Sequence, residues 1–155
     1  MESNNNNKEV KHPFINPNNE IKISEYTDVH ETINFIMDLF TNKNYNTIII
    51  CGLNKAIRKV VLITEIIKAK IPGLHQLNEI NCLSDYEEVF NNNSEELKSN
   101  NNENNEKIIP RLAIKLTFIE PSKEEKEKLG YQNPLNVFEV NLIKKCKDES
   151  MEEYE

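Results

Sequence analysis

Glycine, tryptophan and long apolar runs are scarce or missing in this sequence, which has three glycines and no tryptophan among 155 residues. A loop that wraps a triphosphate needs several glycines and a Gly-Lys-Ser/Thr ending, so nucleotide hydrolysis is not expected. No apolar run approaches the roughly 18 residues that cross a bilayer. The first residues lack the basic and apolar regions of a secretory signal. We expect an intracellular protein of the nucleus, the cytoplasm or both, without a membrane partner.

Side chains suited to catalysis or metal binding are also sparse. The three cysteines, Cys51, Cys82 and Cys146, are odd in number and widely spaced, which excludes a disulfide framework and a zinc site. The three histidines are scattered and never form the HxH or HExxH spacing that places two ligands on one helix face. We therefore expect no metal, no cofactor and no enzymatic activity of the chain itself.

The apolar content is 37 %, below the roughly 45–50 % of a compact domain, and the formal net charge is -7. Polar stretches account for the deficit. We expect a disordered Asn-rich tail over 1–19, a domain over 20–135 with a flexible insert at 91–107, and a C-terminal extension with an acidic tail over 136–155.

The apolar periodicity of the domain predicts an alternation of strands and helices. A capping pair, Asp28 and Glu31, opens the first helix, and the Pro72–Gly73 pair ends the second. Residues 137–143 could add a weak strand or a docking segment. The expected order is β-α-β-α-β-β, an α+β two-layer sandwich with helices on one face of a four-stranded sheet; its strands are expected at 21–23, 47–50, 74–83 and 108–119, with helices between the first three.

The second helix carries an apolar stripe and a cluster of cations near its start. We expect Lys68 to lie off the stripe, which comprises Ile57, Val60, Val61, Thr64, Ile67 and Ile71. The cations are Lys55, Arg58 and Lys59, beside a helix amino-terminus whose free N–H groups favour a phosphate. An exposed surface helix capped by Asn54 explains the same residues equally well. From the residues alone, both interpretations stay open.

Several of these stretches resemble one branch of a known family. They are Gly52-Leu-Asn-Lys-Ala-Ile-Arg-Lys59, Glu65-Ile-Ile-Lys68, Pro72-Gly-Leu-His-Gln76, Pro110-Arg-Leu-Ala-Ile114 and Gly130-Tyr-Gln-Asn-Pro134. Together they resemble the Alba family, in the eukaryotic branch that contains the larger Alba-type subunit of ribonuclease P and ribonuclease MRP. The resemblance covers about residues 20–135. It implies the β-α-β-α-β-β fold and non-catalytic RNA and DNA binding by dimers, each subunit contributing a β-hairpin arm.

The resemblance also implies a set of nucleic-acid-binding residues. Lys55 and Lys59 match the family's basic positions at the second helix, with Arg58 as an additional cation. Lys22, Asn54, Arg111 and Lys115 complete the expected interface. Asn54 stands where the family commonly has glycine, and residues 24–28 replace a basic segment of the family with Ser-Glu-Tyr-Thr-Asp. These departures favour contact with RNA at the Lys55–Lys59 turn over the coating of chromatin along a broad basic surface.

Three functions are compatible with these observations. The first is an RNA-binding subunit of ribonuclease P/MRP, a ribonucleoprotein of tRNA processing, paired with a second Alba-type subunit as a homo- or heterodimer. The second is a general Alba-type protein that binds DNA or RNA in chromatin or translational control. The third is a protein–protein scaffold whose cations are simply solvated.

Overall fold

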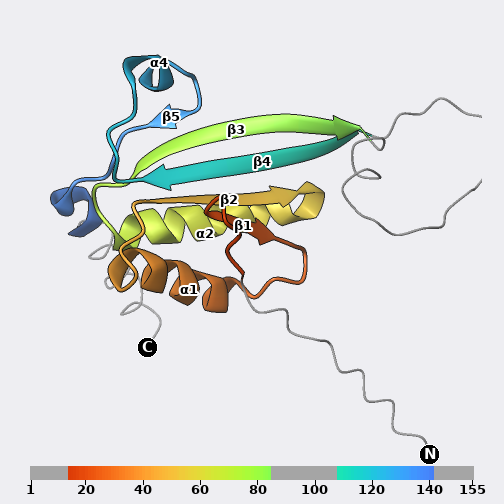
Figure 1. Ribbon diagram of the computed structural model, residues 1–155, viewed down its shortest axis with the longest axis horizontal. Coiled ribbons are helices and arrows are strands. Elements are labelled where there is room, and N and C mark those ends of the chain that lie inside the picture. Colours follow the sequence, from red (N-terminus) through yellow and green to blue (C-terminus); the bar gives the residue numbers. More distant parts are fainter. Residues whose placement is uncertain (1–13, 85–107, 142–155) are drawn as a thin grey trace, which may run out of the picture.

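The computed structural model describes residues 14–84 and 108–141 (Figure 1). The elements follow the expected order through the fourth long strand. They are β1 (Glu20–Ile23), α1 (Val29–Thr41), β2 (Thr47–Leu53), a 3₁₀ turn η1 (Asn54–Ala56), α2 (Ile57–Lys70), β3 (His75–Ser84), β4 (Ile108–Thr117), α4 (Lys123–Lys126) and β5 (Tyr131–Gln132). The expected α+β class is confirmed.

One sheet with the strand order β1-β2-β4-β3-β5 forms the upper layer in Figure 1, and α1 and α2 lie together against its lower face. β1 and β2 are parallel, whereas all other neighbours are antiparallel. The expected number of four strands is wrong by one, because β5 adds two residues beside β3. A two-residue strand has too few positions to leave a periodic signal in the sequence.

The core lies between the sheet and the two helices. Ile48 and Ile50 of the central strand β2 are fully buried under the helices, whereas Ile49 on the opposite face is half-buried. The β-branched run at 47–50 is therefore fully covered only on the face that packs against the helices. The helix-side core is completed by Ile21, Ile36, Leu39, Val60, Ile63, Ile67, Ile114 and Leu116.

The two helices begin in different ways. Asp28 caps α1, since its Oδ1 accepts a hydrogen bond of 2.7 Å from the Glu31 amide, as expected. Asn54 does not cap α2. It takes a positive φ of 49° and opens the 3₁₀ turn, so the cap position falls on Ala56, which makes no side-chain cap. Asparagine tolerates this left-handed conformation better than most residues.

The buried face of α2 differs from the expected stripe. Val61 is 44 % exposed, while Ile63 and Lys68 are buried. The helix begins at Ile57, after the 3₁₀ turn, and it packs against β2, β4 and α1 but hardly against β3, which leaves the Val61 side uncovered. Lys68 is buried because its Nζ donates to Oε1 of Gln132 in β5, at 2.9 Å. The periodicity of α2 could not predict that Lys68 is buried, because its partner Gln132 lies in a distant part of the sequence.

β3 and β4 form a hairpin that continues past the end of β2. The pairing of β2 with β4 ends at Leu53–Arg111, but β3 and β4 pair as far as Ser84–Ile108. Pro110 lies in this overhang, where β4 pairs only with β3, so the missing amide hydrogen of proline leaves no β2 acceptor without a donor. The overhang corresponds to the arm that the family resemblance implies.

The ends of the described chain extend the domain beyond the expected limits. The expected tail includes residues 14–19, but these residues contact the sheet. Ile15 forms a β-bridge with Ile21, and the carbonyl oxygen of Asn19 accepts a hydrogen bond from the Ile49 amide. Residues 137–141 are helical, so a strand there is wrong. Asn136 caps this turn, because its side chain accepts from the amide of Glu139. The predicted tail before residue 14, the insert at 91–107 and the acidic end after 141 lie outside the described residues.

Two motifs that are distant in sequence meet at the β3–β5 edge. His75 stacks on the Tyr131 ring, and its Nδ1 lies 2.9 Å from the Tyr131 hydroxyl. Gly130 passes so close to β3 that a Cβ there would lie 2.4 Å from the Asn78 carbonyl oxygen, which explains the need for glycine. The Gly73–Gln76 and Gly130–Pro134 motifs thus fix one another.

Candidate nucleic-acid interface

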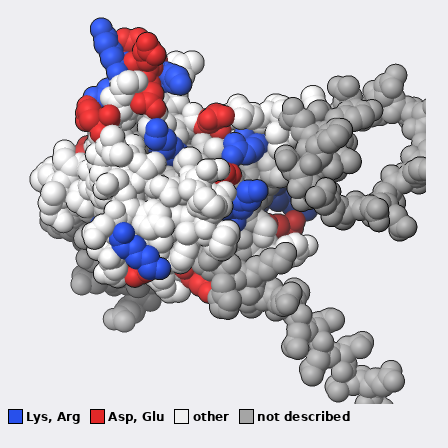
Figure 2. Space-filling model, viewed as in Figure 1, with Lys and Arg blue, Asp and Glu red and all other residues white. Residues whose placement is uncertain are grey.

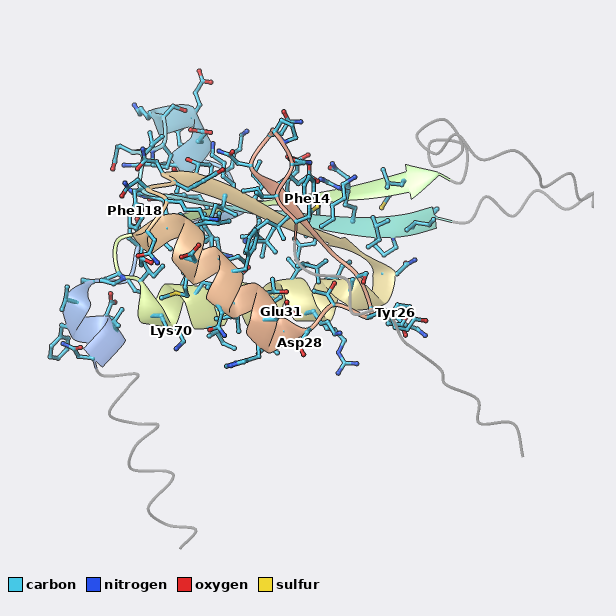
Figure 3. All side chains as sticks on the ribbon, turned by 60° about the horizontal axis from the view of Figure 1, so that its bottom comes forward. Phe14, Tyr26, Asp28, Glu31, Lys70 and Phe118 are labelled. Carbon is cyan, nitrogen blue, oxygen red and sulfur yellow. The ribbon has the colours of Figure 1, made fainter. Side chains whose placement is uncertain are left out.

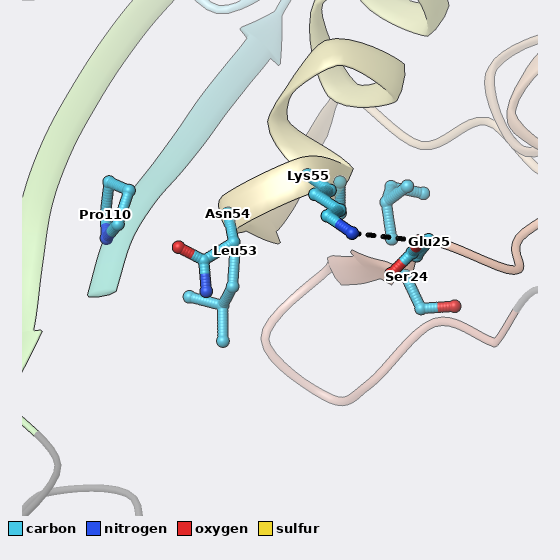
Figure 4. Close-up of a pocket in the computed structure, with 8 residues that line it drawn as sticks. Ser24, Glu25, Leu53, Asn54, Lys55 and Pro110 are labelled. Atoms are coloured by element: carbon cyan, nitrogen blue, oxygen red, sulfur yellow. Dashed lines mark ion pairs between the residues drawn. The ribbon is translucent and has the colours of Figure 1, made fainter. Parts of the chain in front are cut away.

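A shallow hollow of about 860 Å³ lies where the two parallel strands end and α2 begins (Figure 4). Its lining comes from three places in the chain: the end of β1 and the following turn, the β2–α2 turn, and the start of β4. The lining residues are Ile23, Ser24, Glu25, Leu53, Asn54, Lys55, Ala56 and Pro110. The positive φ of Asn54 makes the sharp reversal that brings Lys55 to the rim.

Lys55 is the most accessible expected contact residue in this hollow. Its side chain is 80 % exposed, and its Nζ lies 3.7 Å from Oε1 of Glu25 across the hollow. Glu25 is itself about half exposed. An exposed pair at this distance contributes little stability, of the order of 0–1 kcal/mol. The ammonium can therefore exchange this carboxylate for another anion.

Lys59 has a structural role that the sequence did not indicate. Its Nζ donates hydrogen bonds to the carbonyl oxygens of Glu25, at 2.6 Å, and of Thr27, at 2.7 Å. These bonds tie the first turn of α2 to the loop between β1 and α1. Contact between Lys59 and a phosphate stays a prediction, but its ammonium already has two acceptors inside the protein.

The remaining expected residues are distributed over two surfaces. Arg58 is exposed on the first turn of α2, near the hollow. Lys22 is exposed and points to the open face of the sheet, because it pairs with Cys51 and alternates with the buried Ile21 and Ile23. The structure thus brings Lys55 and Arg58 together at one helix start and leaves Lys22 on a neighbouring face.

Arg111 and Lys115 both point to the open face of the sheet, but only Arg111 lies near the hollow. Arg111 pairs in register with Leu53, a lining residue, whereas Lys115 lies four residues further along β4, about 13 Å away. Arg111 donates to Glu20 at 3.2 Å and Lys115 to Glu125 at 3.3 Å. Both cations are partly neutralised, which weakens their proposed support of a phosphate.

A polar cluster on the open face was missed by sequence reasoning. Oε1 of Glu20 accepts from the Cys51 thiol at 2.7 Å and from Arg111. The thiol hydrogen bond and then the guanidinium hold the pKa of Glu20 below its ordinary value, against the effect of burial. Burial and the Glu20 carboxylate raise the pKa of Cys51 to about 12. The charges of Glu20 and Arg111 cancel, and the Cys51 thiol stays protonated. The cluster therefore has a structural role and offers no reactive thiolate.

The charges on the face seen in Figure 2 alternate in sign. Lysine and arginine side chains lie beside aspartate and glutamate side chains, and a broad uncharged area occupies the middle of the view. This pattern agrees with the acidic net charge of -7. A field spread over the whole surface is thus a poor source of nucleic-acid affinity, and local contacts must supply it.

Other kinds of site find no support in the part of the chain that the structure describes. Within residues 14–84 and 108–141, no three His, Cys, Asp or Glu side chains are grouped to hold a metal ion. In the same residues, no helix has the length and apolarity needed to cross a membrane.

Comparison with known proteins gives a family and solved structures with a similar fold. Residues 19–84 match the model of the Alba family. A solved structure, Alba from Thermoplasma volcanium, superposes with a TM-score of 0.46 and 20 % sequence identity, covering 63 % of this chain and 98 % of the other. No curated protein matches the chain. The similarity to the Alba family therefore covers β1 through β3, including Arg58, Lys55 and most of the hollow that Lys55 borders.

Proposed function

We propose that this protein is a non-catalytic nucleic-acid-binding protein whose main ligand is RNA, with DNA as a second candidate. The observation that carries the proposal is the pair of exposed cations, Lys55 and Arg58, at the turn from β2 into α2. The match of this region to the Alba family supports it.

The local chemistry suits a phosphate. The 3₁₀ turn and the first turn of α2 leave backbone N–H groups without helical acceptors, and the helix dipole adds partial positive charge there. Lys55 and Arg58 bring full charges to the same place. Glu25 opposes an anion but holds Lys55 only through an exposed pair, so exchange of one anion for the other costs little.

The finer proposal is a protein subunit of ribonuclease P/MRP. It is supported by the contact between the two motifs most typical of that branch, through His75 and Tyr131. A general Alba-type protein of chromatin or translational control has the same basic turn, and only the bound nucleic acid separates the two.

A second Alba-type subunit, identical or smaller, is the proposed protein partner. Its support is an apolar surface on the helix side that no described residue covers. Ile80 of β3 is 75 % exposed, and Val61 and Leu62 of α2 are 44 % and 49 % exposed. A protein–protein scaffold would use this same surface, but it would have no need of the basic turn.

The primary test is the salt dependence of RNA binding, measured by fluorescence anisotropy for the wild type and a Lys55→Ala, Arg58→Ala variant. Removal of each cation that binds a phosphate should lower the slope of log affinity against log salt by about 0.7–0.9. Lys43→Ala is the matched control, because Lys43 is exposed and paired with Asp38 just past the end of α1, away from the hollow. Equal slopes for all three proteins would refute the assignment.

The finer functions are separated by purifying the tagged protein from cells and sequencing its RNA. Recovery of the ribonuclease P or MRP RNA with a second Alba-type protein would support the subunit. Broad recovery of messenger RNA or DNA would support the general Alba-type function. Recovery of protein alone, together with no RNA binding at low salt, would support the scaffold.

A further inference from the structure

An exposed tyrosine stands beside the basic turn. Tyr26 lies in the loop between β1 and α1, and 84 % of its surface is accessible. Figure 3 shows it at the margin of the molecule, on the loop that leads to Asp28 and α1. An exposed ring leaves both of its faces accessible to a partner, and Tyr26 differs from the other exposed aromatics in its position next to the basic turn.

The loop that carries Tyr26 is held by its own hydrogen bonds. Residues 24–27 form a β-turn in which the Thr27 amide donates to the Ser24 carbonyl, at 3.2 Å. The Ser24 amide donates to Oγ1 of Thr27 at 2.8 Å, and the Tyr26 amide donates to Oγ of Ser24 at 3.3 Å. Tyr26 occupies the third position of this turn, with its backbone fixed from both sides.

Lys59 anchors the same turn to the basic helix. Its two acceptors are the carbonyl oxygens of Glu25 and Thr27, the residues on either side of Tyr26. Lys55 reaches the Glu25 side chain of the same turn. The backbone of Tyr26 is therefore held next to the start of α2, where Lys55 and Arg58 are exposed.

This arrangement has two of the components used for binding single-stranded nucleic acid. Cations contact the backbone, and an aromatic side chain stacks on a base whose face is free. Inside a duplex, both faces of each base are already stacked and unavailable to a side chain, and only the two outer faces at the ends are free. Because the backbone of the turn is already ordered, binding needs to order only the side chain of Tyr26, which lowers the entropic cost.

We propose that Tyr26 is a stacking platform for an unpaired nucleobase, so that the site at Lys55 and Arg58 binds single-stranded RNA in preference to duplex RNA. This inference rests on the proposed nucleic-acid-binding function and specifies its ligand. The turn lacks the cations that the family has at this position, and it offers an aromatic contact instead.

The test uses the full chain and two fluorescent probes, an oligouridylate of about 12 nucleotides and an RNA duplex of about the same length. Tyr26→Ala should weaken oligouridylate binding by about five- to a hundredfold and duplex binding by less than about twofold. Tyr26→Phe should bind like the wild type, because stacking needs the ring alone. Phe138→Ala is the matched control, since Phe138 is an aromatic of similar exposure, 74 % against 84 % for Tyr26, beyond the other end of α2.

A second measurement reports the contact directly. The chain has no tryptophan, so Tyr26→Trp creates a single tryptophan at the site, whose emission can be excited selectively over that of the tyrosines. Oligouridylate should quench its emission in parallel with binding, while a Phe138→Trp protein should show no quenching. Because both positions are exposed, these variants should keep the wild-type circular dichroism and melting temperature.

The outcomes separate the two proposals. If the wild type binds and the Lys55→Ala, Arg58→Ala variant does not, but Tyr26→Ala binds normally and Tyr26→Trp is not quenched, the stacking inference is wrong and the function stands. Equally weakened binding of both probes by Tyr26→Ala would also overturn it. If the wild type binds neither probe at low salt, the proposed function fails together with the inference.

Discussion

Glu25 and Lys55 face each other across the hollow, with Oε1 of one 3.7 Å from Nζ of the other (Figure 4). This pair places a carboxylate in the position that a phosphate would need. Binding therefore requires the lysine to change partners, and the negative charge of Glu25 then lies close to the incoming anion. The pair limits affinity, and it can be removed without disturbing the fold.

Glu25→Gln should raise the affinity for RNA. The change removes one negative charge beside the site and frees Lys55, and the gain should be about two- to fivefold at low salt. The gain should shrink as salt is added, because exposed charges are screened. Anisotropy titrations at two salt concentrations measure both effects, and unchanged or weaker binding would contradict the position of Glu25 beside the ligand.

Lys59→Ala should reduce the stability of the protein. It removes two charge-assisted hydrogen bonds between α2 and the β1–α1 turn, which corresponds to about 1–2 kcal/mol in the free energy of unfolding. Urea denaturation measures this loss. The exposed neighbour Arg58 provides the control, since Arg58→Ala should stay within about 0.5 kcal/mol of the wild type.

Cys51 and Cys82 should differ strongly in reactivity. The thiolate is the reactive form of cysteine, and the pKa of Cys51, raised to about 12 by burial and Glu20, keeps it protonated at pH 8. Cys82 is exposed on β3. In a Cys146→Ser background, iodoacetamide should label Cys82 within minutes and Cys51 only after unfolding, as read by peptide mass spectrometry. Rapid labelling of native Cys51 would show that the Glu20 cluster opens.

The stability of the protein should fall with pH partly through Glu20. Its folded pKa lies below the ordinary value of 4.5, chiefly through the Cys51 thiol. The stability that Glu20 contributes is thus complete above about pH 4.5 and is lost as the pH falls through the folded pKa. Glu20→Gln should lose less melting temperature than the wild type between pH 6 and about pH 3.5. Glu65→Gln, an exposed change on α2, should follow the wild type.

Gln132→Leu should destabilise the β3–β5 edge by leaving the buried Lys68 ammonium without its Gln132 acceptor. The expected cost is about 1–3 kcal/mol. Adding Lys68→Met should recover most of it, because the buried charge is then gone. Recovery in the double variant distinguishes a buried polar pair from general disruption, which would make the two losses additive.

The sequence predicted the framework of the fold because apolar periodicity depends on local spacing. The isoleucines of β1 and β2 and the Asp28 cap lie where that spacing places them. Lys68 did not follow the pattern. Its burial depends on Gln132, 64 residues away along the chain, and no local pattern carries such information.

The candidate site was predicted in part for the same reason. The cluster of Lys55, Arg58 and Lys59 is visible in the sequence, but the separation of their roles is not. Lys59 differs from Lys55 only because the turn at 24–27 presents two carbonyl oxygens to it. Tyr26 and Glu25 stand out in the sequence only as departures from a basic pattern, and their placement beside the cations required the folded loop.

The pairing of Ser84 with Ile108 closes the hairpin overhang at a point where β2 has already ended. The described chain therefore breaks off at Ser84 and resumes at Ile108, at two backbone positions that face each other across the hairpin. Because this pairing fixes both ends, a change in the number of residues between Ser84 and Ile108 should leave the register of the sheet untouched, and each doubling of a flexible loop costs only about 0.6 kcal/mol of closure entropy. This junction is a suitable place for evolution or an experimenter to insert new sequence, such as an epitope or a fluorescent domain, while the basic turn and the core stay as they are.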